Sequence, residues 1–420
     1  MNRVGSILKI FFIVALGQIA WIAFIIIHPA SAVSANILFL LVLNFLFLIS
    51  VLFPSMLVLA ALGISKSKLY IAPSDREIAV SLVLASLLVF LGFFLIAYDR
   101  MVVRGIDYSA GLRAARYAWM SSGSGSVFGV IGNLLTPLSF FSLIMVMLLY
   151  ERLGWFVKML SLLSITVGVV GVSALNGGRS IVLVALVFML ICLCLRKKSG
   201  KERSSSFKFL FFVIFLAAIF YSSKIVESSA EMGGVSIERL TSLGVNSLYG
   251  EFDRELDCSN LQCLSIYISA YLFHGQWTAQ VTYDLAERAG SYAAYPLSIF
   301  LERLNLIDEP LAPGYFSDSG AFLSLPGALY YDFGFFGVLF FGTVLGAAFG
   351  VCVAFIARAR VFGVIKVFTL MYVFSVVLLS PVVPAYGFIY LNILLLVNIS
   401  YGIFLSLFLG RKFKILESRI

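Results

Sequence analysis

Continuous apolar runs of about 18 or more residues recur along nearly the whole chain, and they constrain its fold more than any other feature. A run of this length is what an α-helix needs to cross the hydrocarbon core of a membrane. With 61% hydrophobic residues and a mean hydropathy of +1.04, the chain is more apolar than a soluble domain. Because lipid offers no hydrogen-bond partners and the runs do not alternate with polar residues, the sequence predicts helices rather than barrel strands. We therefore expect an all-α polytopic membrane protein.

Ten membrane spans are expected from the hydropathy pattern. They lie at about residues 10–27, 35–62, 78–97, 127–149, 157–175, 181–195, 207–221, 328–355, 363–379 and 386–409. The first is followed by Ala30-Ser31-Ala32, which resembles a signal-peptidase site, but its apolar run is longer than a usual signal-peptide core. We therefore expect it to stay in the protein as a transmembrane helix.

Basic residues alternate between the expected loops in the way that sets membrane topology. They gather around Lys66, around Arg196 to Arg203, around Arg358 and after Arg411. The positive-inside rule then places these loops and both termini in the cytoplasm. The chain divides accordingly into an N-terminal transmembrane bundle (1–221) with an outer loop at 99–126, a large outer loop (222–327) and C-terminal transmembrane helices (328–420).

The net charge of +9 is explained by this topology. The inner side holds 20 basic and 5 acidic residues and the outer side 10 basic and 16 acidic, which together give the 30 basic and 21 acidic residues of the chain. The excess of positive charge therefore directs insertion and is not a footprint for nucleic acid.

The outer basic residues are almost all arginine. A single lysine, Lys224, stands among nine arginines, whereas the inner side has 9 arginines and 11 lysines. Because either residue serves topology, the bias favours a task that needs the planar guanidinium, such as gripping phosphate or diphosphate oxygens. Pairing with the outer carboxylates and snorkelling to headgroups is the alternative. The nine are Arg100, Arg104, Arg113, Arg116, Arg179, Arg239, Arg254, Arg288 and Arg303.

Two outer segments of the first half concentrate these arginines. Arg113 and Arg116 are three apart, so on a helix they would share a face, with Tyr117 and Trp119 between or beside them. Arg179 follows Asn176-Gly177-Gly178 and is the only charge for more than fifteen residues either way. The two glycines predict a tight turn with exposed backbone amides. An arginine at such a depth is costly without a partner, so Arg179 is a functional candidate or a helix-end arginine that snorkels.

The large outer loop carries the candidate proton-transfer groups. His274 is its only histidine and could serve as a general base, or it could be a half-buried structural side chain. Glu251 belongs to a run of acids that lacks the glycine and distal glutamate of a calcium loop. If the loop is outside the cytoplasm, Cys258 and Cys263 could form a disulfide.

Two aspartates near the end of this loop complete the candidates. Asp318 lies in Phe-Ser-Asp-Ser-Gly, and Asp332 lies in the sequence that leads into the eighth span. An unpaired carboxylate at the membrane boundary is costly. Asp332 would therefore either pair with an outer arginine or cap the start of a helix.

Several of these segments together resemble the bacterial Wzy-type oligosaccharide repeat-unit polymerases, the O-antigen polymerases of the inner membrane. The resemblance rests on Asn176-Gly-Gly-Arg-Ser180, on the large late outer loop and on Pro326-Gly-Ala-Leu-Tyr-Tyr-Asp-Phe-Gly334. An arginine followed by a glycine after ten intervening residues, a pattern described in the periplasmic loops of some members, occurs from Arg100, Arg239 and Arg303.

The resemblance implies a membrane glycosyltransferase of the GT-C-like class, with 10–14 spans and a periplasmic active side. It implies transfer of a growing glycan between undecaprenyl-diphosphate carriers, with inversion at the anomeric carbon, no metal and no other cofactor. Donor and acceptor would both be lipid-linked oligosaccharides in contact with membrane lipids, and a chain-length regulator protein would be the partner.

Residue roles follow as hypotheses. Arg179 with Arg113 and Arg116 would grip the donor diphosphate, where charge develops as it leaves. Arg239 and Arg303 would hold the acceptor or product lipid, and the remaining outer arginines would support substrate binding. The general base would be one of Asp318, Asp332, Glu251 or His274. Alternatives are an O-antigen ligase, which transfers the glycan to lipid A core, and a lipid-linked glycan flippase or transporter, which would more typically show internal repeats.

Overall fold

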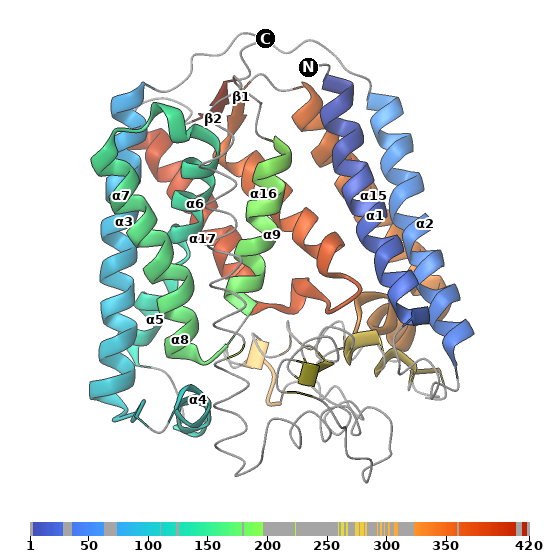
Figure 1. Cartoon of the computed structure of the whole chain (residues 1–420), viewed down its shortest axis with the longest axis horizontal. Helices are drawn as coiled ribbons and strands as arrows, with labels where there is room; N and C mark the ends of the chain where they lie inside the picture. The colour runs from blue at the N-terminus through green and yellow to red at the C-terminus, as the bar shows by residue number, and fades with distance from the viewer. Residues whose placement is uncertain are drawn as a thin grey trace. The chain divides into compact units, whose positions relative to one another are not determined.

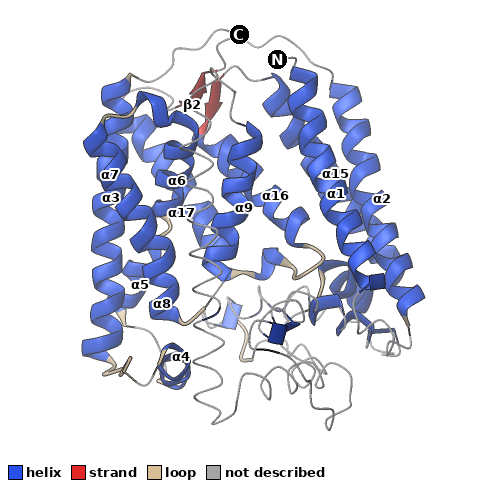
Figure 2. Ribbon diagram, viewed as in Figure 1, coloured by secondary structure: helices blue, strands red, loops and turns tan. Residues whose placement is uncertain are grey.

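The part of the chain that the computed structural model describes is almost entirely helical (Figures 1 and 2). The structure describes residues 3–27, 36–62, 74–109, 111–122, 126–178, 180–195, 323–358, 361–408 and 414–417. Between these it also describes residues 223, 259, 262–263, 266–267, 274–276, 278–280, 282–283, 292, 295, 298, 301–302 and 306–309.

Six helical segments of the described residues are long and apolar enough to cross a membrane. They are α2 (Ile37–Leu62), α3 with its π-helical end η2 (Asp75–Val103), α5 and α6 (Val127–Arg152), α7 to α8 (Trp155–Asn176), α15 (Leu325–Phe355) and α17 (Ile389–Phe408). Shorter apolar helices lie in α1 (Arg3–Ile27), α9 (Ser180–Leu195) and α16 (Val364–Leu379). The prediction of a helical, multi-pass membrane protein is confirmed.

The expected number of spans stays a prediction. Nine of the ten expected spans coincide with helices, of which six reach the length and hydropathy needed to cross, and the tenth, 207–221, lies outside the described residues. The described chain also contains one short antiparallel pair, β1 (Val361–Gly363) and β2 (Lys414–Glu417), in which Val361 is the partner of Glu417 (Figure 2). The hydropathy pattern did not indicate these strands.

The chain folds into two compact units, each built from separate parts of the sequence. Unit 1 comprises Met1–Ser65, Ser236–Ala357 and Tyr372–Ile389. Unit 2 comprises Lys66–Val235, Arg358–Met371 and Tyr390–Ile420. Long-range contacts therefore decide which parts of the chain pack together.

Unit 1 packs α15 closely against α2. Three glycines of α15, Gly342, Gly346 and Gly350, recur at every fourth position and face Ser50 to Ser55 of α2. A Cβ at Gly346 would overlap the backbone of Val51, and one at Gly350 would lie 2.6 Å from the carbonyl oxygen of Ser55. Ser55 Oγ donates a hydrogen bond of 2.8 Å to the carbonyl of Gly346. The small residues thus bring two helix backbones into contact, as is typical of helix pairs in lipid.

The start of α15 is fixed by contacts with the large loop and with the segment after α16. Ser324 precedes the helix and its hydroxyl accepts a hydrogen bond from Gly327 N, with proline at position 326, as is typical of a helix start. Ser324 N donates to Gly275 O at 2.9 Å, and Leu325 N donates to Ser380 O at 2.8 Å. Gln276 is buried and exchanges hydrogen bonds with Asn44 of α2. Part of the large loop is therefore packed into the core of unit 1.

Gly334 breaks α15 just after Asp332. Its backbone has φ 67° and ψ −163°, a conformation that is essentially restricted to glycine. The residues from Leu325 to Phe333 therefore form a short helix of their own before the longer one begins.

We expect Gly334→Ala to lower the stability of unit 1, because a Cβ is strained at this φ whatever the space around it. The cost should be about 1–3 kcal/mol, seen as a lower midpoint of thermal unfolding of the purified protein in detergent. Gly363→Ala is the matched control, since nothing lies within 4 Å of the position its Cβ would take. An unchanged midpoint for Gly334→Ala would contradict the left-handed conformation.

Unit 2 is built on α3. The helix begins with a capping box, in which Ser74 Oγ accepts from Glu77 N and Glu77 Oε2 accepts from Ser74 N. Its apolar length packs against α5, α6 and α7. Tyr401 of α17 donates a hydrogen bond of 2.6 Å from its hydroxyl to Ser81 O, which ties α17 to α3.

Candidate functional site

A short amphipathic helix, α4 (Leu112–Ser121), carries Arg113 and Arg116 at one end of unit 2 (Figure 1). The segment is helical, which is the condition under which Arg113 and Arg116, three residues apart, share a face. Arg113 donates from Nη2 to the hydroxyl of Tyr117 at 3.1 Å. Only Ala115 of α4 is buried among the side chains that the structure describes there, so polar contacts supply most of its attachment.

Arg116 attaches α4 to the turn that precedes α9. Its Nη1 donates a hydrogen bond of 3.0 Å to the carbonyl of Gly177, and both arginines of α4 are half-buried. Arg179 itself lies outside the described residues, but its neighbours Gly178 and Ser180 are described. The structure therefore brings Arg116 to the same turn as the residue that the sequence singled out.

The Gly177–Gly178 turn closes the helix α8 (Val172–Asn176). Gly177 has φ 57°, and its N–H donates to Ala174 O, while Gly178 N–H donates to Ser173 O. This is the Schellman arrangement, in which the turn satisfies the last carbonyls of the helix before it. The expectation of exposed amides in this turn is therefore wrong, because both glycine N–H groups are already used. The first turn of α9, which begins at Ser180, contributes N–H groups that have no partner within the helix itself.

Arg100 packs against Trp119 of α4 and is almost fully buried, with 3% of its surface exposed. Its Nη2 donates to Asn176 Oδ1 at 3.1 Å, and its guanidinium carbon lies 3.7 Å from the ring centroid of Trp119. Arginine stacked on tryptophan in this way gains about 0.5–2 kcal/mol, more when water is excluded. Arg100, expected to bind substrate, instead makes its contacts with Asn176, Trp119 and Asp99.

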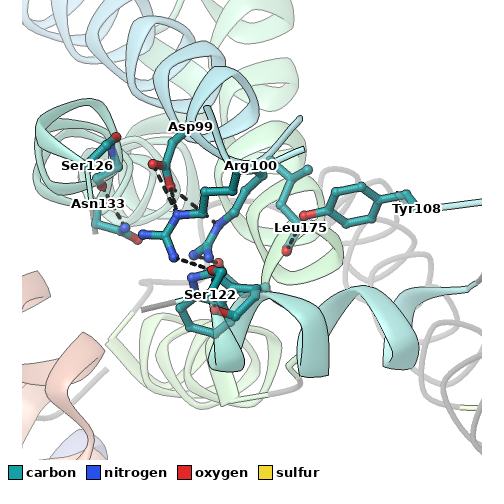
Figure 3. Close-up of polar contacts among 11 residues, drawn as sticks. Asp99, Arg100, Tyr108, Ser122, Ser126, Asn133 and Leu175 are labelled. Carbon is teal, nitrogen blue, oxygen red and sulfur yellow. Dashed lines mark hydrogen bonds and ion pairs between the residues drawn. The ribbon is translucent and has the colours of Figure 1, made fainter. Parts of the chain in front are cut away.

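Asp99 balances the buried charge of this cluster. It is 1% exposed and lies 3.2 Å from Arg104 Nε and 3.9 Å from Arg100 Nε. Arg104 reaches past it to Ser122 at the end of α4, donating from Nη1 at 2.9 Å (Figure 3). Removing one member of a buried ion pair typically costs about 3–5 kcal/mol, because the other charge is left without its partner. Asp99 is therefore needed to keep Arg100 inside the protein.

Tyr108 adds a second link between the loop and α8. Its hydroxyl donates to Leu175 O at 2.8 Å, and burial raises its pKa, so the hydroxyl keeps its proton and remains a donor (Figure 3). Together, Tyr108 and Arg116 attach the segment from 105 to 122 to the end of α8.

Asp99, Asn176 and Tyr108 were missed as site residues by sequence reasoning. A signal was present for Asp99, because an Asp-Arg pair directly after a long apolar run places two charges at the membrane boundary, where they are costly apart. Asn176 and Tyr108 carry no such signal, since their contacts join residues 76 and 67 positions apart.

Asp332 occupies a separate buried cluster in unit 1. It is 2% exposed, and its Oδ1 accepts a hydrogen bond of 3.0 Å from the backbone N–H of Tyr292. Asp332 lies within the short helix from Leu325 to Phe333, two residues before the break at Gly334, and its role as a cap stays a prediction. Its contact ties the large loop to α15.

The negative charge of Asp332 affects the pKa of two tyrosines. Burial, followed by the negative charge of Asp332, raises the pKa of Tyr386, which lies between α16 and α17. Burial also raises the pKa of Tyr292, and Asp332 adds to that shift. Both hydroxyls therefore remain protonated at neutral pH, so neither adds a second negative charge to that of Asp332.

His274 is half-buried at the segment that contacts Ser324. Its Nδ1 lies 3.4 Å from Thr278 Oγ1, and Thr278 Oγ1 donates to His274 O at 2.9 Å. This placement fits the structural alternative for the histidine, and its catalytic role stays a hypothesis.

The remaining candidates cannot be placed. Cys263 is disulfide-bonded, and its expected partner, Cys258, lies outside the described residues. Also outside them are Glu251, Asp318, Arg179, Arg239, Arg254, Arg288 and Arg303. The described candidates thus form two groups, one in each unit: the arginines of unit 2, and His274 and Asp332 of unit 1.

Comparison with known proteins found no matching family model, no matching curated protein and no matching solved structure. The chemistry of the site must therefore be argued from its residues. In unit 2, guanidinium groups lie beside a turn that leads into a helix N-terminus. Positive charge and the N-terminal end of a helix both favour an oxyanion.

Proposed function

We propose that the protein is a glycosyltransferase of the bacterial inner membrane that polymerises oligosaccharide repeat units carried on undecaprenyl diphosphate. The observation that carries the proposal is the hydrogen bond from Arg116 to Gly177 O. It sets the arginine face of α4 beside the turn that leads through Arg179 into α9. An arginine cluster at the end of membrane helices suits a substrate whose anionic diphosphate stays attached to a lipid.

In this reaction the terminal sugar hydroxyl of the acceptor attacks the anomeric carbon of the donor glycan. A new carbon–oxygen bond forms there, the bond to the diphosphate oxygen breaks, and the diphosphate leaves with the electron pair. Arg113, Arg116 and Arg179 would stabilise the charge that grows on the leaving diphosphate, where fixed donors act most strongly. The first turn of α9 would add its N–H groups and its dipole.

The acceptor hydroxyl must lose its proton to a base. Asp332, Asp318, Glu251 and His274 are the proposed candidates, and the acceptor lipid would be held by Arg239 and Arg303. Among the described two, Asp332 is a buried carboxylate whose negative charge acts on Tyr292 and Tyr386, and burial is one of the ways in which proteins tune a carboxylate for proton transfer. The proposal requires that the carboxylate of Asp332 contacts the acceptor hydroxyl.

The disulfide of Cys263 supports the side of the membrane on which this chemistry is placed. Disulfides persist in oxidising compartments such as the bacterial periplasm. The distribution of basic residues in the sequence places the large loop on the same side.

The proposal is tested by elongation in a defined system. The purified protein, reconstituted into liposomes with a single kind of lipid-linked repeat unit and with lipid A core, is expected to produce a ladder of longer lipid-linked chains without added nucleotide or metal. Glycan moved only onto lipid A core would identify a ligase instead. Glycan moved across the bilayer without a new glycosidic bond would identify a flippase. Either result, or no product, would overturn the proposal.

A further inference from the structure

We infer that Arg100 is a positioning residue: it holds the Asn176–Gly178 turn and α4 in the geometry that the oxyanion site requires, and it does not touch the diphosphate itself. The inference rests on the proposed function, and it assigns Arg100 a role different from that of Arg113 and Arg116. It is carried by a closed set of contacts among residues of unit 2.

The contacts of Arg100 reach both partners of the site. Through Nη2 it holds Asn176, the residue directly before Gly177, at 3.1 Å. Through the face of its guanidinium it holds Trp119 of α4 at 3.7 Å. One side chain therefore touches both the turn and the helix that carries the other arginines.

Arg116 provides a second contact between α4 and the same turn. It lies three residues before Trp119, so both side chains leave the same face of α4. Trp119 rests on Arg100, while Arg116 donates to the carbonyl of Gly177 at 3.0 Å. Three contacts therefore link the turn and α4 in a ring: Arg100 with Asn176, Arg116 with Gly177, and Trp119 with Arg100. Breaking it at Arg100 releases two of its links at once.

Arg100 is more deeply buried than Arg113 and Arg116. Arg100 is 3% exposed and is covered by Trp119, so a lipid diphosphate cannot reach it while α4 is in place. Arg113 and Arg116 are half-buried and keep part of their surface open. A buried guanidinium fixed by protein partners positions other groups, whereas a partly open one can also bind a ligand.

The local backbone directs Arg100 inward. Residues 99–103 form a π-helical turn, η2 (Asp99–Val103), in which Arg104 N donates to Asp99 O. Asp99 and Arg100 are buried in this turn, while Met101, Val102 and Val103 are exposed. A second π-helical turn, η4 (Val167–Gly171), directly precedes α8 and its Asn176. Single π-turns within α-helices are frequent at functional sites, and here η2 contains Arg100 while η4 directly precedes the helix that ends at Asn176.

The test uses a double-mutant comparison with farnesyl diphosphate as the probe, bound to the full-length protein in nanodiscs. If Arg100 acts through Arg116, Arg100→Lys should raise the dissociation constant about tenfold in the wild-type background and less than about twofold in the Arg116→Gln background. Lysine keeps the charge but loses the planar stack and the directed donor to Asn176. In the elongation assay, the same variant should raise the KM for the lipid-linked donor by a similar factor.

Two further measurements separate positioning from general loss of stability. Hydrogen exchange of the peptide that contains Asn176 to Ser180 should rise in Arg100→Lys. It should stay unchanged in Tyr401→Phe, which removes a buried hydrogen bond elsewhere in unit 2. Trp119→Ala should reproduce the effect of Arg100→Lys on affinity, and Trp119→Phe should restore part of it because a ring face remains. The Trp119 pair keeps the test decisive if Arg100→Lys does not fold.

The outcomes are distinct. An equal effect of Arg100→Lys in both backgrounds, or no effect in the wild-type background, would overturn the positioning role and leave the proposed function standing. Failure of the wild-type protein to bind the probe and to elongate its substrate would overturn the proposed function, and the inference with it.

Discussion

Gly346→Leu is expected to prevent unit 1 from reaching its native packing. A side chain at this position has no room, because even the first carbon would overlap the backbone of Val51 in α2. Backbone cannot move aside as the end of a flexible side chain can, so α2 and α15 would have to separate. The cost should reach at least about 3 kcal/mol, the upper range for overpacking. The measurement is the fraction of monodisperse protein after extraction, with the midpoint of thermal unfolding.

Gly154→Leu is the matched control for this substitution. Nothing lies within 4 Å of the position that a Cβ at Gly154 would take, and its backbone has an ordinary φ of −66°. The same side chain added there should leave yield and midpoint close to wild type. If Gly346→Leu behaved like this control, the close contact of α2 with α15 would be wrong.

Arg116→Gln is expected to lower the rate of chain elongation about 100-fold, the usual cost of removing one preorganised donor at a developing negative charge. Glutamine can still donate a hydrogen bond to Gly177 O, so α4 should remain attached while the positive charge is lost. The loss should therefore appear both in kcat with saturating donor, measured as product chains per enzyme per minute, and in a raised KM for the lipid-linked donor. Thermal stability should change little, because Arg116 is half-buried.

Arg152→Gln provides a control for removing an arginine from unit 2. Arg152 pairs with Asp75 at 2.7 Å in a partly exposed ion pair at the start of α3. Exposed pairs contribute about 0–1 kcal/mol, so this variant should elongate at a wild-type rate. Elongation by Arg116→Gln within twofold of wild type would contradict the role of Arg116 at the diphosphate.

Sequence reasoning located the helices well because each apolar run carries its own constraint. In lipid, the backbone must satisfy its hydrogen bonds within the segment, so length and hydropathy alone nearly fix the bounds of α2, α7 to α8 and α17. Breaks within helices were less visible. The π-turns η2 and η4 and the break at Gly334 depend on neighbouring helices, and hydropathy has no signal for them.

The candidate site was predicted in part. Arg113, Arg116 and the Asn176–Gly178 turn were singled out separately, and the structure joins them through the contact between Arg116 and Gly177. Arg100 was grouped with the other outer arginines because charge and type are the same for all of them. Arg100 differs from Arg113 and Arg116 because it is buried against Trp119 and Asn176. The sequence around Arg100 does not predict this burial.

The sequence by itself determined that this is a helical membrane protein, because hydropathy is a local property of the chain, and it predicts that the basic residues on the outer side are nearly all arginine. Only the tertiary structure decided which arginines share a turn, which one is buried, and that the glycine amides of the turn are already bonded. The physical reason is that burial and hydrogen bonding are relations between distant residues. The bond between Arg100 and Asn176 spans 76 positions, and it forms only once α3 and α7 to α8 have packed.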